Sequence, residues 1–62
     1  MKQVTKEDFF KVIGPINCVP CPEGKYPYTA IYKTPEGKEV GRKVETLVDG
    51  KYPPVKTYFL PD

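Results

Sequence analysis

The sequence predicts an α+β fold in which one N-terminal helix packs on a three-stranded antiparallel β-meander. Three observations support this: an amphipathic segment near the start, extended segments that alternate apolar and polar residues, and turn signals between those segments. The chain has 62 residues, so we expect a single small domain over residues 1–62.

The first expected element is a helix over about residues 5–13. Thr5 can cap the free N–H groups of the first turn, and Asp8 suits the positive end of the helix dipole. Gly14 and Pro15 are expected to end the helix, with Gly14 in the left-handed conformation that often follows a last turn. The apolar stripe of the helix consists of Phe9, Val12 and Ile13.

Residues 14–27 are predicted to form an extended connection rather than a regular element. This segment contains four of the eight prolines of the chain. Each proline fixes its own φ angle and pushes the preceding residue toward extended geometry. We therefore expect a stiff connection that either packs on the body or has a function.

Residues 28–60 are predicted to form the three-stranded meander. The segments 28–34 and 39–48 are rich in β-favouring residues, and Gly41 in the second segment indicates a bulge or a bend. A third strand should begin at Lys51, be interrupted at Pro53-Pro54, and resume over residues 55–60.

Two turn signals join these strands. In Thr34-Pro35-Glu36-Gly37-Lys38, the proline presets one turn position and the glycine can adopt a positive φ angle. Asp49-Gly50 is the strongest hairpin signal in the chain and predicts a tight two-residue turn.

Alternation along the first strand separates Tyr28 and Tyr32 from Ile31. We expect Ile31 to face the helix and the two tyrosines to face outward. A one-residue slip in register would exchange the two faces, and this alternative stays open. The expected core consists of Phe9, Val12, Ile13, Ile31, Val40, Val44 and Phe59, with Leu47 or Leu60 closing one end.

The composition weighs against an enzyme. Histidine and serine are absent, so the commonest general base and the serine nucleophile are both missing. No phosphate-binding glycine motif occurs, and we expect no cofactor. No apolar run approaches the roughly 20 residues of a membrane span, and the N-terminus has no secretory signal pattern. We therefore expect a cytoplasmic protein without a membrane partner.

The pair Cys18-Val19-Pro20-Cys21 resembles the redox motif of thioredoxin-like proteins over four residues, but no βαβ pattern surrounds it. We expect two reduced thiols and no metal site within one chain, because structural zinc needs four ligands. A lesser alternative is a dimer in which Cys18 and Cys21 of two copies share one metal ion.

The function predicted from the sequence is a small stand-alone binding module that is not an enzyme and that contacts another protein. It would act as an accessory or regulatory factor of the kind that phages and plasmids encode. The expected partner-binding residues are Tyr28, Tyr32, Arg42, Lys33 and Lys43, since aromatic residues and arginine often anchor interfaces. The alternative is weak nucleic-acid binding through the outer face of the sheet, where tyrosines between lysines could stack on bases.

Overall fold

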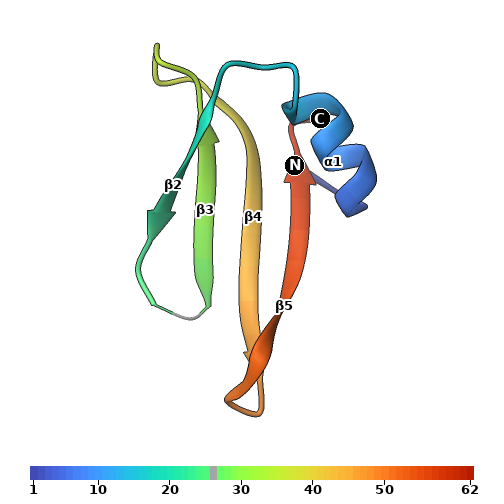
Figure 1. The fold of residues 1–62 in the computed structure, drawn as a ribbon, viewed down its shortest axis with the longest axis vertical. Coiled ribbons are helices and arrows are strands. Elements are labelled where there is room, and N and C mark those ends of the chain that lie inside the picture. Colours follow the sequence, from blue (N-terminus) through green and yellow to red (C-terminus); the bar gives the residue numbers. More distant parts are fainter. Residues whose placement is uncertain (26) are drawn as a thin grey trace.

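The described part of the chain forms one helix and a five-stranded antiparallel sheet (Figure 1). The computed structural model describes residues 1–25 and 27–62, and it describes Glu23 by its backbone alone. The elements are β1 (Lys2–Val4), α1 (Lys6–Ile13), β2 (Val19–Glu23), β3 (Tyr28–Lys33), β4 (Glu39–Val48) and β5 (Lys51–Leu60). The strand order is β1-β5-β4-β3-β2. The α+β class is confirmed, whereas the expectation of three strands is wrong.

The two additional strands lie at the two edges of the sheet. β1 pairs with the end of β5, from Val4 opposite Tyr58 to Lys2 opposite Leu60. β2 pairs with β3 along its whole length, so the connection expected over residues 14–27 contains a strand. Its two prolines are compatible with this because β2 is an edge strand, which needs hydrogen-bond donors on one side only.

The predicted helix is confirmed, including its first turn. The Thr5 hydroxyl accepts a hydrogen bond from the Asp8 N–H at 3.1 Å. At the other end, Gly14 has right-handed angles (φ −52°, ψ −47°), and its N–H donates to the Phe10 carbonyl at 2.8 Å. The expected left-handed ending is therefore wrong, because the chain continues its helical rotation for one more residue.

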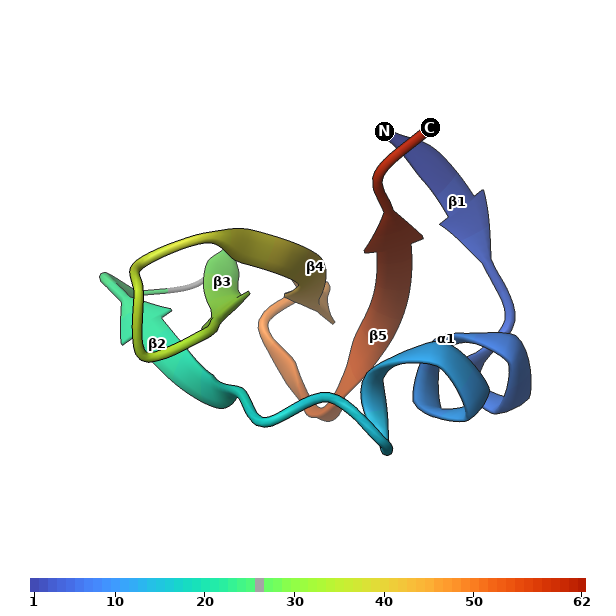
Figure 2. The same cartoon turned by 90° about the horizontal axis from the view of Figure 1, so that it is seen from above.

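The helix takes the chain from one edge of the sheet to the other. β1 and β2 lie at opposite edges, and α1 with residues 14–18 joins them on one side of the sheet (Figures 1 and 2). This path places α1 over the end of the sheet formed by β5 and β4. No element of the described chain lies on the other side.

Both predicted turns are confirmed. After β3, the Gly37 N–H donates to the Thr34 carbonyl at 2.8 Å, and Gly37 has a φ angle of 87°. Between β4 and β5, Asp49 and Gly50 both have positive φ angles, 53° and 68°. A two-residue loop with two positive φ angles is a type I′ turn, whose twist matches that of the adjoining strands.

β5 continues through Pro53 and Pro54, so the expected interruption is wrong. β1 pairs only with the last three residues of β5, and the prolines therefore lie where β5 has one neighbouring strand. The register also shifts between Thr46 and Val48, which relaxes the pairing at this point. Residues 46–55 extend past the last pair between β3 and β4 as a two-stranded ribbon, here called the distal ribbon (Figure 1).

The core lies between α1 and the sheet, and Phe9 is at its centre with no exposed surface. The Phe9 ring lies 5.2 Å from the Tyr32 ring and 5.1 Å from the Tyr58 ring, measured between centroids. Aromatic pairs in tilted and edge-to-face arrangements stabilise a core by more than the burial of their apolar surface alone would. The other buried members are Ile13 and Leu60, with Val4, Cys18 and Val40 packed against them.

The predicted core is thus correct for Phe9 and Ile13 of the helix and wrong for Val12 and for much of the sheet. Phe9, Ile13 and Leu60 are buried, and Val40 is partly buried. Val12 is 46% exposed, because an eight-residue helix on one sheet buries only the narrow stripe that faces the strands. The sheet residues expected inside are half-buried on the other side of the sheet, namely Ile31, Val44 and Phe59.

Candidate functional site

The side of the sheet away from α1 carries a patch of half-buried side chains in two cross-strand rows. Residues paired across antiparallel strands point to the same side, and side chains along one strand alternate. The first row is Ile31, Arg42 and Phe59, and the second is Thr29, Val44 and Thr57. These six residues alternate with the core residues Tyr32 and Tyr58, and they are here called the open face.

A hollow lies on the open face beside the N-terminus. Met1, Arg42, Val44 and Phe59 line it, and its volume is about 430 Å³. Met1 contributes one side of this hollow, and it directly precedes the edge strand β1. Figure 2 shows both chain ends on the side of the sheet away from α1. The hollow therefore combines three apolar side chains with one guanidinium group.

Arg42 is held in place by Glu39. The Arg42 Nη2 donates to both carboxylate oxygens of Glu39 at 3.0 Å. One nitrogen shared between both carboxylate oxygens holds the guanidinium group beside Glu39, and Arg42 has no second nitrogen bonded to this carboxylate. Arg42 Nε is buried without a hydrogen-bond partner among the described residues, while 40% of the side chain as a whole is exposed.

A bulge in β4 makes this ion pair possible. Lys33 pairs with Glu39 and Tyr32 pairs with Gly41, so Val40 is an extra residue without a direct partner. In a regular strand, residues three apart point to opposite sides. The extra residue reverses the alternation and brings Glu39 to the same side as Arg42. From the sequence, Gly41 indicates a bulge or a bend; the structure shows a bulge whose extra residue is the neighbouring Val40, and its effect on Glu39 and Arg42 was not predicted.

The structure divides the five predicted partner-binding residues between the two sides of the sheet. Tyr32 is only 9% exposed in the core, and Tyr28 lies on the same side as Tyr32. Lys43 also points to the helix side, where its Nζ lies 3.9 Å from Glu45 Oε2. Arg42 and Lys33 lie on the opposite side. The predicted outward direction of the tyrosines is wrong, and the alternative register that places Ile31 outward is correct.

Burial also affects the chemistry of Tyr32. The pKa of its hydroxyl is raised above the ordinary value of 10.0, first by burial and next by the nearby hydroxyl of Tyr58. Both causes penalise the phenolate, since burial removes water and a neighbouring negative charge repels it. Tyr32 is therefore a neutral, protonated member of the core.

Tyr26, another of the five tyrosines, lies outside the described residues.

The two cysteines contact different sides of the sheet. Cys18 packs against the core, and its Sγ lies 4.0 Å from the Ile13 carbonyl oxygen. Cys21 belongs to β2 and pairs with Ile31, so it lies toward the open face. Both thiols are free. Within residues 1–25 and 27–62, no group of three or more histidine, cysteine or acidic side chains is placed to hold a metal ion.

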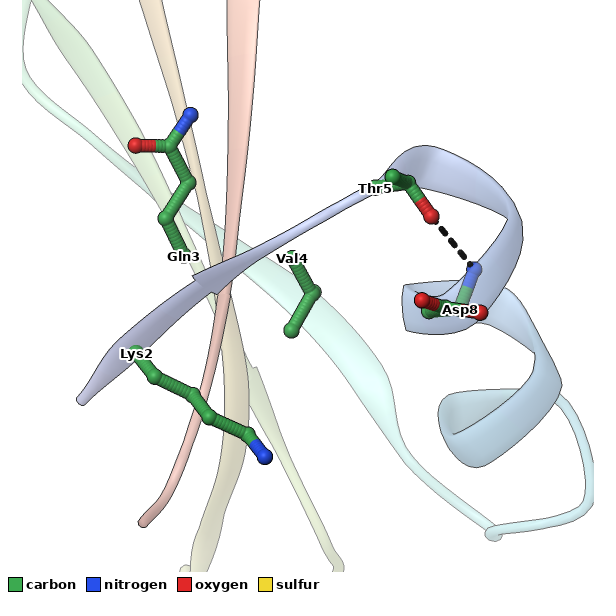
Figure 3. Close-up of a pocket in the computed structure, with 5 residues that line it drawn as sticks. All are labelled: Lys2, Gln3, Val4, Thr5 and Asp8. Carbon is green, nitrogen blue, oxygen red and sulfur yellow. Dashed lines mark hydrogen bonds between the residues drawn. The ribbon is translucent and has the colours of Figure 1, made fainter.

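A second hollow, of about 610 Å³, lies at the corner between β1 and α1 (Figure 3). Lys2 and Gln3 extend to opposite sides of β1, and Val4 points inward. The hydroxyl of Thr5 is directed at the backbone nitrogen of Asp8 and caps the helix. The Thr5 hydroxyl and the Asp8 N–H are thus already hydrogen-bonded to each other. This leaves fewer polar groups for a ligand at the corner, and we therefore take the open face as the candidate site.

Comparisons with protein-family models, with curated proteins and with solved structures give no match for this chain. In the part of the chain that the structure describes, no helix is long and apolar enough to cross a membrane.

Proposed function

We propose that this chain is a small, non-enzymatic protein-binding module that uses the open face. The observation that carries the proposal is the position of Ile31, Val44 and Phe59 on a side of the sheet that no described element covers. A sheet usually buries its apolar side against a second layer. An apolar side without such a layer is typical of an interaction surface.

Arg42 gives this surface an orienting contact. Arginine is enriched among residues that dominate binding energy, because its planar group can form paired hydrogen bonds and stack on rings. Glu39 holds the guanidinium group before any partner binds. A group held in advance loses less conformational entropy on binding.

Binding energy should therefore concentrate at the centre of the open face. We expect Arg42→Ala or Ile31→Ala to weaken partner binding about tenfold or more, as for interface anchors in general. Arg42→Lys should also weaken binding, since it keeps the charge and loses the planar fork.

Nucleic-acid binding has less support as an alternative. The tyrosines expected to stack on bases, Tyr28 and Tyr32, lie on the helix side. On the other side, the positive charges of Lys33 and Arg42 are partly balanced by Glu39. A surface that binds nucleic acid needs unbalanced positive charge to displace counterions.

Site-specific photocrosslinking in the source cells tests the proposal. A photoreactive amino acid at Thr57 should give a protein adduct that survives nuclease treatment and disappears with Ile31→Ala. The same amino acid at Val12, exposed on α1, is the matched control and should give no such adduct. An adduct that nuclease removes would support the nucleic-acid alternative. Equal adducts from both positions would contradict the role of the open face.

A further inference from the structure

We propose that a second copy of this chain covers the open face when no other partner is bound. This inference rests on the proposed function and concerns how the same surface is regulated. Self-association and partner binding would then compete for Ile31, Val44 and Phe59. The number of free open faces would fall as the concentration of the chain rises.

The surface area of the chain is the first reason to expect a second copy. The structure exposes 4481 Å². A compact monomer of 7.1 kDa is expected to expose about 4,100 Å². The uncovered side of the sheet and the exposed residues of the distal ribbon, such as Val48 and Val55, both contribute to this difference. Small chains commonly compensate for a limited core by forming oligomers.

The edges of the sheet are poor places for self-association. In β2, all five residues pair with β3, and Pro20 and Pro22 have no N–H to donate. An edge strand with two prolines has fewer donors to offer another strand, and prolines of this kind protect a sheet edge from further pairing. At the other edge, β1 is only three residues long. Two copies are thus more readily joined through a face than through strand pairing.

The open face is also compatible with its own copy. An isologous interface brings the same residues of two copies together, so a surface of one charge would repel itself. Here the centre is apolar, and of the two positive charges on this side, those of Arg42 and Lys33, the charge of Arg42 is paired with that of Glu39. Threonines flank the centre at positions 29 and 57. Packing of two sheets face to face at about 10 Å is a common arrangement of such surfaces.

The available area predicts a weak dimer. Five strands about 4.8 Å apart span about 19 Å, and the six residues of β3 extend about 20 Å. The flat area is therefore about 400 Å² for each copy and about 800 Å² for the pair. Side-chain relief increases this value, which still lies below the roughly 1,200 Å² of stable interfaces and in the range of weak, transient contacts. We expect reversible association rather than a permanent dimer.

Sedimentation of the wild-type chain between about 10 µM and 1 mM tests this inference, since weak interfaces need high concentration. The average mass should rise from 7.1 kDa toward twice that value. Val44→Glu should remain a monomer throughout, because it places a charge at the centre of the face. Val12→Glu is the control on the exposed side of α1, and it should associate like the wild type.

A second measurement uses the wild-type chain alone, so its result does not depend on whether Val44→Glu folds. In amide NMR spectra recorded on dilution, the signals of Ile31, Val44 and Phe59 should move, and those of the distal ribbon should not. A wild-type chain that stays at 7.1 kDa up to about 1 mM would overturn the inference. Signal changes confined to β2 or the ribbon would also overturn it.

The two proposals can fail separately. If the wild-type chain is monomeric while the Thr57 adduct still depends on Ile31, the second copy is wrong and the binding module stands. If dilution moves the open-face signals and the only adduct in cells has twice the chain mass, the second copy stands and binding to a different protein is wrong.

Discussion

At Gly41 two side chains of α1 lie against the sheet where a Cβ atom would be, and Gly41→Ala measures how tightly these two layers pack. A Cβ atom at this position would lie 2.8 Å from the Phe9 Cε1 and 2.9 Å from the Ile13 Cδ1. Both distances are shorter than ordinary contacts between carbon atoms. Alanine can be accommodated only if the helix or the two side chains move.

The expected effect is a clear loss of stability. Inserting a methyl group into a packed core costs about 1–3 kcal/mol. The φ angle of Gly41 is not positive, so the backbone tolerates alanine, and lower entropy of the unfolded chain offsets about 0.4–1 kcal/mol. We therefore expect a net loss of about 1–2 kcal/mol. For a domain of this size, that lowers the melting temperature by roughly 5–15 °C.

Thermal and urea unfolding measure this loss, and a second substitution tests its cause. Ile13→Val removes the Cδ1 atom and costs about 0.5–1.5 kcal/mol alone. The double variant should be more stable than the sum of the single effects predicts, by about 0.5 kcal/mol or more. Thr46→Ala, on the same strand but exposed, is the control and should change little.

Two results would refute this reasoning. A Gly41→Ala variant that melts at or above the wild-type temperature would show that the layers have room for a methyl group. If the effects of the two substitutions are additive, the Ile13 Cδ1 atom is not what the added methyl group collides with.

Three further predictions concern the turn, the cap and the core hydroxyl. Gly50→Val should lower the melting temperature more than Lys51→Val, because a β-branched residue resists the φ angle of 68° in the type I′ turn; equal effects would contradict this turn type. Thr5→Ala should cost about 1 kcal/mol in urea unfolding, since it removes the acceptor for the Asp8 N–H; an unchanged midpoint would show that the cap contributes nothing. For Tyr32, whose pKa is raised by burial and then by Tyr58, the stabilising contribution is present below pH 10 and lost as the pH rises through the raised pKa. Thermal melts between about pH 8 and pH 11 should therefore show a steeper loss for the wild type than for Tyr32→Phe, and parallel curves would contradict this.

Local signals in the sequence were sufficient for the helix and the turns. The Thr5 cap and the Asp49-Gly50 hairpin depend on residues within four positions of each other, so they need no knowledge of the rest of the fold. The bulge beside Gly41 was predictable for the same reason. Its effect on Glu39 and Arg42 could have been derived by counting one extra residue along β4.

The edges and the faces of the sheet could not be predicted in this way. β1 is three residues long, too short for alternation to be recognised, and it exists because the end of β5 provides a partner. β2 contains prolines that usually argue against a strand. Its position at the edge, which makes them acceptable, is a property of the whole sheet.

The incorrect prediction of which residues of β3 face the helix has a similar cause. Tyr32 and Ile31 are both apolar enough for a core, so alternation along β3 separates them without deciding which one faces the helix. Phe9 decides it in the structure, because a cluster of rings around it buries Tyr32 and Tyr58 together. That cluster joins three elements, and no single segment contains its signal.

The distal ribbon implies that stability is unevenly distributed along one strand. β4 begins beside the core at Gly41, which is buried, and ends at Val48, which is 57% exposed. An isolated two-stranded ribbon is only marginally stable in water, and residues 46–55 have no third strand beside them. Amide hydrogen exchange should therefore be slow at the Gly41 end of β4 and fast at the Val48 end, with the ribbon opening while the core stays folded. The molecule would then have a larger rigid part that carries the open face and a short ribbon that can separate its strands without unfolding the rest.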